Sequence, residues 1–258
     1  MSAAPAPASP DLVEDAALAR RIADEAGRLL LGIQRSGLFE GKPLGRVGDH
    51  TANAFIMEAL RTHRPADAIL SEEEKDDHAR LSARRVWIVD PLDGTREYGE
   101  GRSDWAVHVA LAVDGIAAAG AVALPAEPLT FCTGAPGPLP PLGERLRVLV
   151  SRSRPGREAL AVAETLGAEL IPMGSAGAKA MAVVRGLADI YVHSGGQYEW
   201  DNCAPVAVAA AHGLHCSRID GRPLTYNHAD PALPDLLICP PALAPRVLEL
   251  VAALPPTP

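Results

Sequence analysis

The chain has 258 residues, of which 48% are hydrophobic and 22% are charged, so it is long enough for one large globular domain or two smaller lobes. The formal net charge of −8 argues against nucleic acid as a partner, because binding to a phosphate backbone needs a basic surface. A small phosphorylated molecule remains compatible with this charge if metal ions supply the positive charge.

The cysteines and the N-terminal residues indicate in which cellular compartment we expect the protein. The four cysteines lack the CxxC spacing of zinc and redox sites, so we expect reduced thiols in a cytoplasmic protein. Residues 1–10 are rich in Ala and Pro and lack the basic and apolar regions of a signal peptide, which predicts a disordered tail. No apolar run reaches the roughly 18 residues that a membrane span needs. We therefore expect a soluble protein without a membrane partner.

The first half of the sequence combines helical and strand patterns. Apolar residues recur at helical spacing over residues 11–34 and again over 49–60. Residues 41–48 predict a loop, which places Asp49 near the first turn of the following helix. Short apolar runs predict strands at 68–70 and 85–89, and the runs 105–113 and 116–124, joined by Asp114-Gly115, predict a β-hairpin. We therefore expect an N-terminal α+β lobe over residues 11–132.

A change of pattern follows residues 133–143, a Pro/Gly-rich run that cannot form a helix or a central strand. We interpret this run as an exposed loop at a lobe boundary. Strand patterns at 146–150, 168–171, 189–192 and 236–238 then alternate with helical patterns at 156–166, 176–185, 201–211 and 241–254. This alternation predicts a C-terminal α/β lobe over residues 144–258.

Several carboxylates stand where these elements end or begin. Asp90 ends a predicted strand, Asp93 lies in the turn after it, Glu72 follows a short strand, and Asp201 opens a predicted helix. Side chains at such positions point into a shared crevice in α/β folds, and several carboxylates together suit Mg²⁺. Each acid alone also fits a turn former or a helix cap. Taken together, the four favour a metal site.

The turn "DPLDGT" (residues 90–95) has features that suit a phosphate group. Pro91 stops the strand, and Gly94 lets a ligand approach the backbone closely. The amides of Gly94 and Thr95 can hold phosphate oxygens, and Thr95 adds a hydroxyl. The Asp-x-Asp-Gly-Thr motif of haloacid-dehalogenase phosphatases is one residue shorter, so it does not match. Residues 174–180 lack the Gly-Lys-Ser/Thr ending of a P-loop.

Three separated motifs resemble one known family. "WIVDPLDGT" (87–95), "WDNCAP" with "AHG" (200–205 and 211–213) and "LSEE" (70–73) are similar to the signatures of the lithium-sensitive, magnesium-dependent phosphatases related to inositol monophosphatase. The order and spacing fit from about residue 11 to residue 240. This resemblance implies an α/β (α+β) fold, a layered α-β-α-β-α sandwich of the inositol monophosphatase and fructose bisphosphatase type.

Within that family, other stretches look like the CysQ-type 3′(2′),5′-bisphosphate nucleotidases. These are "TREY" (95–98), "GSAGAK" (174–179) and "DGRPLTYN" (220–227). Inositol phosphatases usually carry a sugar-contacting Glu shortly before the Trp-Asp motif, and Ser194 occupies that slot here. The resemblance therefore favours a nucleotide over inositol. It also places Lys179 and the 220–227 loop towards the remaining phosphate or the base of the nucleotide, with a solvated lysine and a surface turn as the alternative.

The resemblance assigns roles to individual residues. Two or three Mg²⁺ ions, sensitive to Li⁺, would be held by Glu72, Asp90, Asp93, Asp201 and the carbonyl of Leu92. Thr95, bonded to Asp49 or Glu72, would orient and deprotonate a water whose pKa the metal lowers. Phosphate and substrate contacts would come from Asp93, Gly94, Thr95, Ser175 and Lys179. The family's Thr-x-x-Asp motif is Arg46-Val-Gly-Asp49 here, so Asp49 is kept without its threonine.

The implied activity is removal of the 3′-phosphate of adenosine 3′,5′-bisphosphate (PAP), a by-product of sulfate assimilation, to give AMP and phosphate. The related sulfated nucleotide PAPS is a further substrate under this interpretation. One alternative is the same chemistry on inositol or fructose 1,6-bisphosphate, and another is a non-catalytic nucleotide sensor. The expected partner is a small phosphorylated substrate, with a homodimer as the expected assembly.

Overall fold

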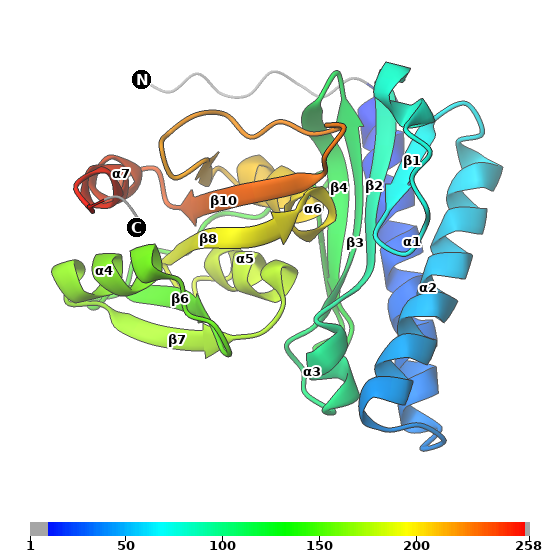
Figure 1. The fold of residues 1–258 in the computed structure, drawn as a ribbon, viewed down its shortest axis with the longest axis horizontal. Helices are drawn as coiled ribbons and strands as arrows, with labels where there is room; N and C mark the ends of the chain where they lie inside the picture. The colour runs from blue at the N-terminus through cyan, green and yellow to red at the C-terminus, as the bar shows by residue number, and fades with distance from the viewer. Residues whose placement is uncertain (1–9, 256–258) are drawn as a thin grey trace.

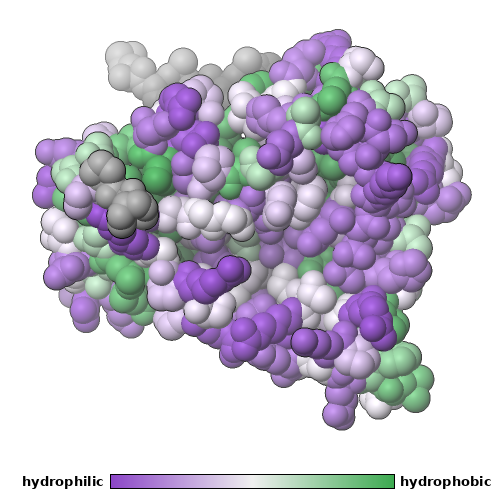
Figure 2. All heavy atoms as spheres, in the orientation of Figure 1, coloured by the Kyte–Doolittle hydropathy of each residue, from purple (hydrophilic) through white to green (hydrophobic). Residues whose placement is uncertain are grey.

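The computed structural model describes residues 10–255, which form two five-stranded sheets separated and flanked by helices (Figure 1). The expected disordered tail at 1–10 lies outside the described residues, apart from Pro10, which is the first residue of a helix. Hydrophilic residues cover most of the face shown in Figure 2, and hydrophobic ones form small separate patches on it. No helix within residues 10–255 is both long and apolar enough to cross a membrane.

The first sheet has the order β1-β2-β3-β4-β5, with β1 and β2 parallel and the other pairs antiparallel. Its strands are β1 (Ala68–Ser71), β2 (Arg85–Asp93), β3 (Ala106–Val113), β4 (Ile116–Leu124) and β5 (Leu129–Cys132). Helices α1 (Pro10–Arg35) and α2 (Gly41–His63) cover its outer face, as Figure 1 shows. A 3₁₀ helix, η1 (Ala79–Ser82), precedes β2, and the short helix α3 (Thr95–Gly99) follows it.

The second sheet has the order β7-β6-β8-β10-β9. Its strands are β6 (Arg147–Ser151), β7 (Glu169–Met173), β8 (Ile190–Tyr198), β9 (His215–Ser217) and β10 (Ala232–Cys239). Strand β6 is parallel to β7 and β8, whereas β10 is antiparallel to β8 and β9. Helices α4 (Arg157–Leu166) and α7 (Ala244–Ala252) pack on the outer face of this sheet, over a cluster that includes Val148, Val162 and Val247.

Two helices of the second half, α5 (Ala176–Val184) and α6 (Glu199–Ala211), lie between the sheets. All nine residues of α5 are buried, as expected for a helix in which every residue except Lys179 is small or apolar. One hydrophobic cluster joins Ile88 of the first sheet, Met181 of α5 and Leu236 of the second sheet. The α-β-α-β-α sandwich expected from the sequence is therefore confirmed, and its middle layer brings the first turns of α5 and α6 to the first sheet.

The expected loop at residues 41–48 is wrong, because α2 begins at Gly41 and runs through this segment. Two of its glycines, Gly45 and Gly48, serve close packing within a helix. A Cβ on Gly45 would lie 2.8 Å from Thr95 Cγ2, and a Cβ on Gly48 would lie 2.7 Å from Tyr98 Cε1. Asp49 is consequently a buried residue well inside α2 and does not lie near its start.

Other differences are smaller. The sequence analysis did not predict β5 and β9, which have only four and three residues. Residues 133–143 form neither helix nor strand, in agreement with the expected loop, and the chain passes from the first sheet to the second there. The division into two lobes at this loop and the expected homodimer stay predictions.

Two glycines of α1, Gly27 in its second half and Gly32 in its last turn, provide a matched test of the packing between α1 and the first sheet. A Cβ added to Gly32 would have no other atom within 4 Å, so Gly32→Ala should raise the free energy of unfolding by about 0.5–1 kcal/mol. Gly27 faces Pro125, whose Cγ would lie 2.5 Å from an added Cβ, so Gly27→Ala should lower it by about 1–3 kcal/mol. Denaturant unfolding of both variants checks this, and equal effects would contradict the packing described.

Candidate metal centre

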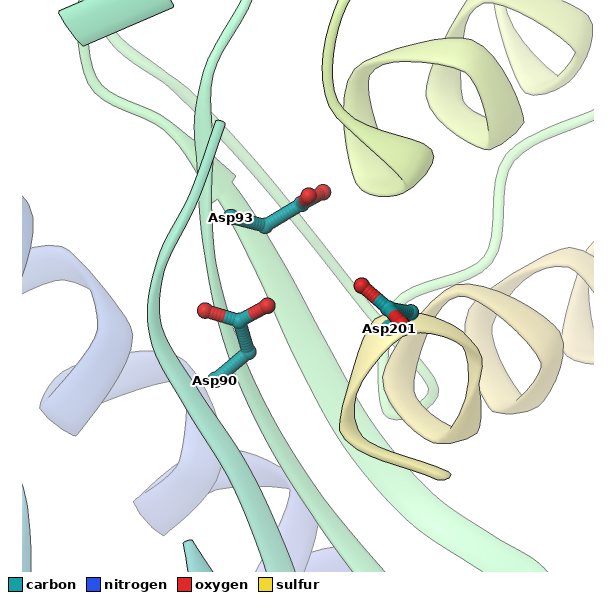
Figure 3. A group of neighbouring side chains, drawn as sticks. All are labelled: Asp90, Asp93 and Asp201. Carbon is teal, nitrogen blue, oxygen red and sulfur yellow. The ribbon is translucent and has the colours of Figure 1, made fainter. Parts of the chain in front are cut away.

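The centre begins with an irregularity in β2. Residues three apart on a regular strand face opposite sides of a sheet. In the pairing of β2 with β3, however, Asp90 lies opposite His108 and Asp93 lies opposite Ala106, so β2 has one extra residue. This β-bulge contains Pro91, whose missing N–H a bulge tolerates. The bulge brings both aspartates to the side that faces α6 (Figure 3).

Asp201, in the first turn of α6, completes a group of three carboxylates. One oxygen from each of Asp90, Asp93 and Asp201 lies within 4.8 Å of the others, and the three side chains converge in Figure 3. Asp90 and Asp93 are buried, and Asp201 is partly buried. Three of the four carboxylates predicted from strand ends and a helix start therefore converge, and they come from both halves of the chain.

Each of the three carboxylates uses one oxygen within the protein. Asp90 Oδ1 accepts a hydrogen bond from the amide of Leu92 at 3.0 Å, and Asp201 Oδ2 accepts one from the amide of Tyr198 at 2.6 Å. Asp93 Oδ2 accepts hydrogen bonds from Ser175 Oγ at 2.5 Å and from the amide of Gly177 at 2.7 Å. The second oxygen of each aspartate accepts no hydrogen bond from residues 10–255. This set of hard oxygen donors can hold a divalent cation.

The pKa values of the three aspartates also favour a bound cation. Burial and the neighbouring Glu72 raise the pKa of Asp90 well above its usual range. Burial and Asp93 raise the pKa of Asp201 to about 6. Burial also acts on Asp93, but its contacts with His108 and Ser175 outweigh it and lower the pKa to about 2. The group therefore contains an ionised carboxylate beside two that resist ionisation, and a cation would relieve that repulsion.

His108 is a residue of this centre that the sequence analysis did not identify. It is fully buried, with Nε2 3.2 Å from Asp93 Oδ2 and Nδ1 3.0 Å from the carbonyl oxygen of Trp200. Burial lowers its pKa, but Asp93 more than offsets this, so the pKa is raised. The imidazole thus bridges the strand that carries Asp93 to the start of α6. The only signal for His108 in the sequence is its place opposite Asp90 in the pairing of β2 with β3. That pairing depends on the bulge in β2, which the sequence does not predict.

Thr95 and Asp49 form a second polar group beside the cluster. Thr95 Oγ1 lies 3.2 Å from Asp49 Oδ2 and 3.0 Å from the carbonyl oxygen of Leu92, so its single proton is donated to one of the two. Asp49 Oδ1 is buried without a hydrogen-bond partner in the described part of the chain. Burial and the nearby Glu73 raise the pKa of Asp49 to about 7. This carboxyl can therefore exchange a proton close to neutral pH.

A pocket of about 580 Å³ opens next to this pair, between α2 and α3. Asp49 and Thr95 line it together with Arg46, Lys42 and Glu73. The partly exposed Thr95 therefore borders the pocket, with the buried Asp49 behind it.

Gly94 precedes Thr95 with φ of 90°, a conformation that favours glycine. A Cβ there would lie 3.3 Å from Ser175 Cβ and from the Asp104 carbonyl oxygen. The turn therefore packs directly against the start of α5, and Thr95 begins the helix that follows. Its role in holding phosphate stays a prediction.

Glu72 and the carbonyl of Leu92 do not belong to the three-carboxylate group in this structure. Glu72 is exposed to solvent on one side. On its other side, burial against the protein and the nearby carboxylates of Asp49 and Asp201 raise its pKa. Its amide donates to the carbonyl oxygen of Val89 at 3.2 Å, which fixes its backbone beside β2. Metal binding by these two groups stays a prediction.

Ser175 and Lys179, predicted as phosphate or substrate contacts, are engaged within the protein. Ser175 has φ of 48°, and its Oγ, besides donating to Asp93, accepts a hydrogen bond from the amide of Ala178 at 3.0 Å. Lys179 Nζ donates to the carbonyl oxygens of Gly174 and Ser175 at 3.1 and 2.7 Å. It also lies 5.3 Å from the ring centroid of Tyr191. Both side chains support the turn that holds Asp93, and their contact with a substrate stays a prediction.

The raised pKa values predict how stability depends on pH and metal. A carboxyl whose pKa is raised in the folded state stabilises it below the unfolded pKa of about 4, and this is lost as pH rises through the folded value. For Asp201 and Asp49 those values are about 6 and about 7. In EDTA, the Tm should therefore fall between pH 5 and pH 8, and Mg²⁺ or Mn²⁺ should raise it, most strongly at pH 8.

Asp90→Asn is the matched variant for this measurement, because it removes one charge and keeps the side-chain shape. Its Tm in EDTA should fall less steeply with pH, and divalent cations should raise it little. A Tm that does not respond to divalent cations in the unsubstituted protein at pH 8 would contradict the metal centre.

Comparisons with known proteins agree with this geometry. Residues 46–254 match the inositol monophosphatase family. A Mycobacterium leprae protein named 3′-phosphoadenosine 5′-phosphate phosphatase is 47% identical over 255 residues, covering 92% of this chain and 93% of that protein. Escherichia coli 3′(2′),5′-bisphosphate nucleotidase CysQ is 32% identical over 199 residues, covering 70% of this chain and 78% of that protein. The crystal structure of CysQ from Bacteroides thetaiotaomicron aligns with a TM-score of 0.79 at 25% identity, over 88% of this chain and 97% of that one. With this match over most of its length, the chain belongs to the inositol monophosphatase family.

Proposed function

We propose that the chain is a Mg²⁺-dependent phosphatase that hydrolyses the 3′-phosphate of adenosine 3′,5′-bisphosphate to AMP and phosphate. The observation that carries the chemistry is the three-carboxylate cluster, with the Thr95–Asp49 pair beside it. The names of the relatives in Mycobacterium leprae and Escherichia coli support a nucleotide carrying a 3′-phosphate as substrate. PAPS, which carries the same 3′-phosphate, is a further substrate under this proposal.

The cation would be held by Asp90, Asp93 and Asp201, with Glu72 and the carbonyl of Leu92 as further ligands. When bound, Mg²⁺ supplies a water of lowered pKa and neutralises charge on the phosphate oxygens. Each aspartate keeps one oxygen in a hydrogen bond from a backbone amide, so its carboxylate plane is fixed before any ligand arrives. Li⁺ would inhibit by competing for these oxygens.

Thr95 and Asp49 would move the proton. Thr95 Oγ1 accepts a proton from the attacking water as it donates its own to Asp49, which lies 3.2 Å away. The Asp49 carboxylate, whose Oδ1 has no hydrogen-bond partner among residues 10–255, would take this proton and release it afterwards. The amides of Gly94 and Thr95 would orient the phosphate for in-line attack, and no covalent bond to the protein forms.

Ser194 bears on the choice between nucleotide and inositol. It stands on β8, in the slot where inositol phosphatases usually carry a glutamate, and its hydroxyl donates to Glu158 of α4. A serine held in this way does not offer the carboxylate that would bind sugar hydroxyls. This supports a nucleotide substrate over inositol phosphate.

The proposal is tested by phosphate release from adenosine 3′,5′-bisphosphate, inositol 1-phosphate and fructose 1,6-bisphosphate, with Mg²⁺, with EDTA and with added Li⁺. We expect the highest kcat/KM for the nucleotide, lost in EDTA and reduced by Li⁺. A preference for a sugar phosphate would overturn the substrate and keep the chemistry. Binding of the nucleotide without any phosphate release would favour a sensor.

Substitution of Thr95 separates proton transfer from metal binding. Thr95→Ala should lower kcat by about 10²–10⁴-fold, because it removes the group that takes the proton, and should leave the metal-induced rise in Tm. Asp93→Asn should abolish both turnover and that rise in Tm. Thr62→Ala, at an exposed position near the end of α2, is the control and should change neither. A Thr95→Ala variant with lower stability and an unchanged kcat would refute the assigned role.

A further inference from the structure

Residues 220–227, "DGRPLTYN", have no part in the chemistry described above. This segment connects β9 to β10 in the second sheet, yet its end lies against the first sheet. The amide of Tyr226 donates to the carbonyl oxygen of Gly115, in the turn between β3 and β4, at 2.9 Å. The segment therefore spans the two halves of the chain.

Asn227 contacts η1, in the connection between β1 and β2 of the first sheet. Its φ is 65°, a left-handed conformation that Asn tolerates better than most residues. Its Oδ1 accepts a hydrogen bond from Arg80 Nη1 at 2.8 Å, and its Nδ2 donates to the carbonyl oxygen of Arg80 at 3.1 Å. Arg80 is 2% exposed and lies in η1, on the connection between β1 and β2 that also carries Glu72.

Arg80 has further partners that fix its guanidinium. Nη2 donates to the carbonyl oxygen of His228 at 2.9 Å and to Asp76 Oδ2 at 2.7 Å. The buried charge is thus paired and hydrogen-bonded, which is the condition for a stable position inside a protein. Asn227 and His228 are both attached to the first half of the chain through this one arginine.

The same two residues are bonded to the first residue of α6. Glu199 is fully buried, and its Oε2 accepts a hydrogen bond from the Asn227 amide at 2.7 Å. Its Oε1 accepts hydrogen bonds from the His228 amide at 2.8 Å and from His228 Nδ1 at 2.7 Å. Glu199 stands two residues before Asp201, within the same helical turn.

We propose that Arg80, Asn227 and Glu199 form a tether that positions Asp201 against the aspartates of β2, and that Asn227 does not contact substrate. The like charges of the three-carboxylate cluster repel one another at less than 5 Å and push the start of α6 away from β2. The tether opposes this displacement, because it joins Glu199 in the first turn of α6 to Arg80 in the connection between β1 and β2. It therefore keeps the cation site assembled when no cation is bound, which lowers the cost of binding one.

The tether can be tested with Asn227→Gly. Glycine adopts the left-handed conformation without strain, so this variant keeps the backbone and loses only the two side-chain bonds to Arg80. We expect the dissociation constant for Mn²⁺, measured by calorimetry without substrate and well below the Tm, to rise by about 10-fold or more. At saturating Mn²⁺, the KM for adenosine 3′,5′-bisphosphate should stay unchanged.

Two further variants complete the design. Arg80→Lys keeps the charge near Asp76 and loses the fork of hydrogen bonds, so it should weaken Mn²⁺ binding in the same way. Arg222→Ala, on the same segment but 70% exposed and paired with Asp220, should leave Mn²⁺ binding unchanged. Unchanged Mn²⁺ affinity in Asn227→Gly, with or without a lower Tm, would overturn the proposal. A raised KM with unchanged Mn²⁺ affinity would also overturn it and assign the segment to substrate binding.

The kinetic part of this test rests on the proposed function, whereas the calorimetric part does not. A protein that binds Mn²⁺ through the tethered site and releases no phosphate from any substrate would refute the proposed function and leave the tether standing. Full phosphatase activity, together with the same Mn²⁺ affinity in Asn227→Gly and the unsubstituted protein, would support the proposed function and refute the tether. A protein that binds no Mn²⁺ would refute both.

Discussion

Repulsion among carboxylates is the interaction around which the rest of the structure is arranged. Asp90, Asp93 and Asp201 place oxygens within 4.8 Å of one another in a mostly buried position, where water cannot screen their charges well. The interactions among these carboxylates do not stabilise the group, because each ionised carboxylate raises the free energy needed to ionise the next. The group persists because hydrogen bonds from backbone amides and the Ser175 hydroxyl, together with the contact to the His108 imidazole, hold its members individually.

The layered fold supplies those hydrogen bonds. Helices α5 and α6 lie between the sheets and direct their first turns at the bulge of β2, so the amide of Gly177 and the carboxylate of Asp201 meet Asp93 from the second half of the chain. The glycines of α2 act in a similar way on the other side. Gly45 and Gly48 let this helix approach Thr95 and Tyr98 closely, which sets the distance between Asp49 and the Thr95 hydroxyl.

The sequence predicts a large part of this arrangement, for identifiable reasons. Asp90 and Asp201 converge because strand ends and helix starts meet at one crevice. Alternation of strands with helices predicted four of the five strands of the second sheet, all except the three-residue β9. The helical start of α2 was missed because three glycines within eight residues resemble a loop. The close partners that explain two of them, Thr95 for Gly45 and Tyr98 for Gly48, are known only from the fold. His108 was missed because its neighbours are distant in the sequence. Asp93 reaches it through the pairing of β2 with β3, and Trp200 belongs to a helix about 90 residues later in the chain. Long-range packing of that kind leaves no local pattern.

The hydrogen bonds that position Asp93 also have a consequence for the kinetics of folding and unfolding. Asp93 is joined to Ser175 and Gly177 across 82 and 84 residues of chain, so the complete three-carboxylate cluster exists only after both sheets have packed on α5 and α6. Closing loops of that length is a late event in folding. A cation that binds the finished site then stabilises the native state without stabilising the transition state. Its effect falls on the rate of unfolding, and it makes the protein longer-lived without helping it to fold faster.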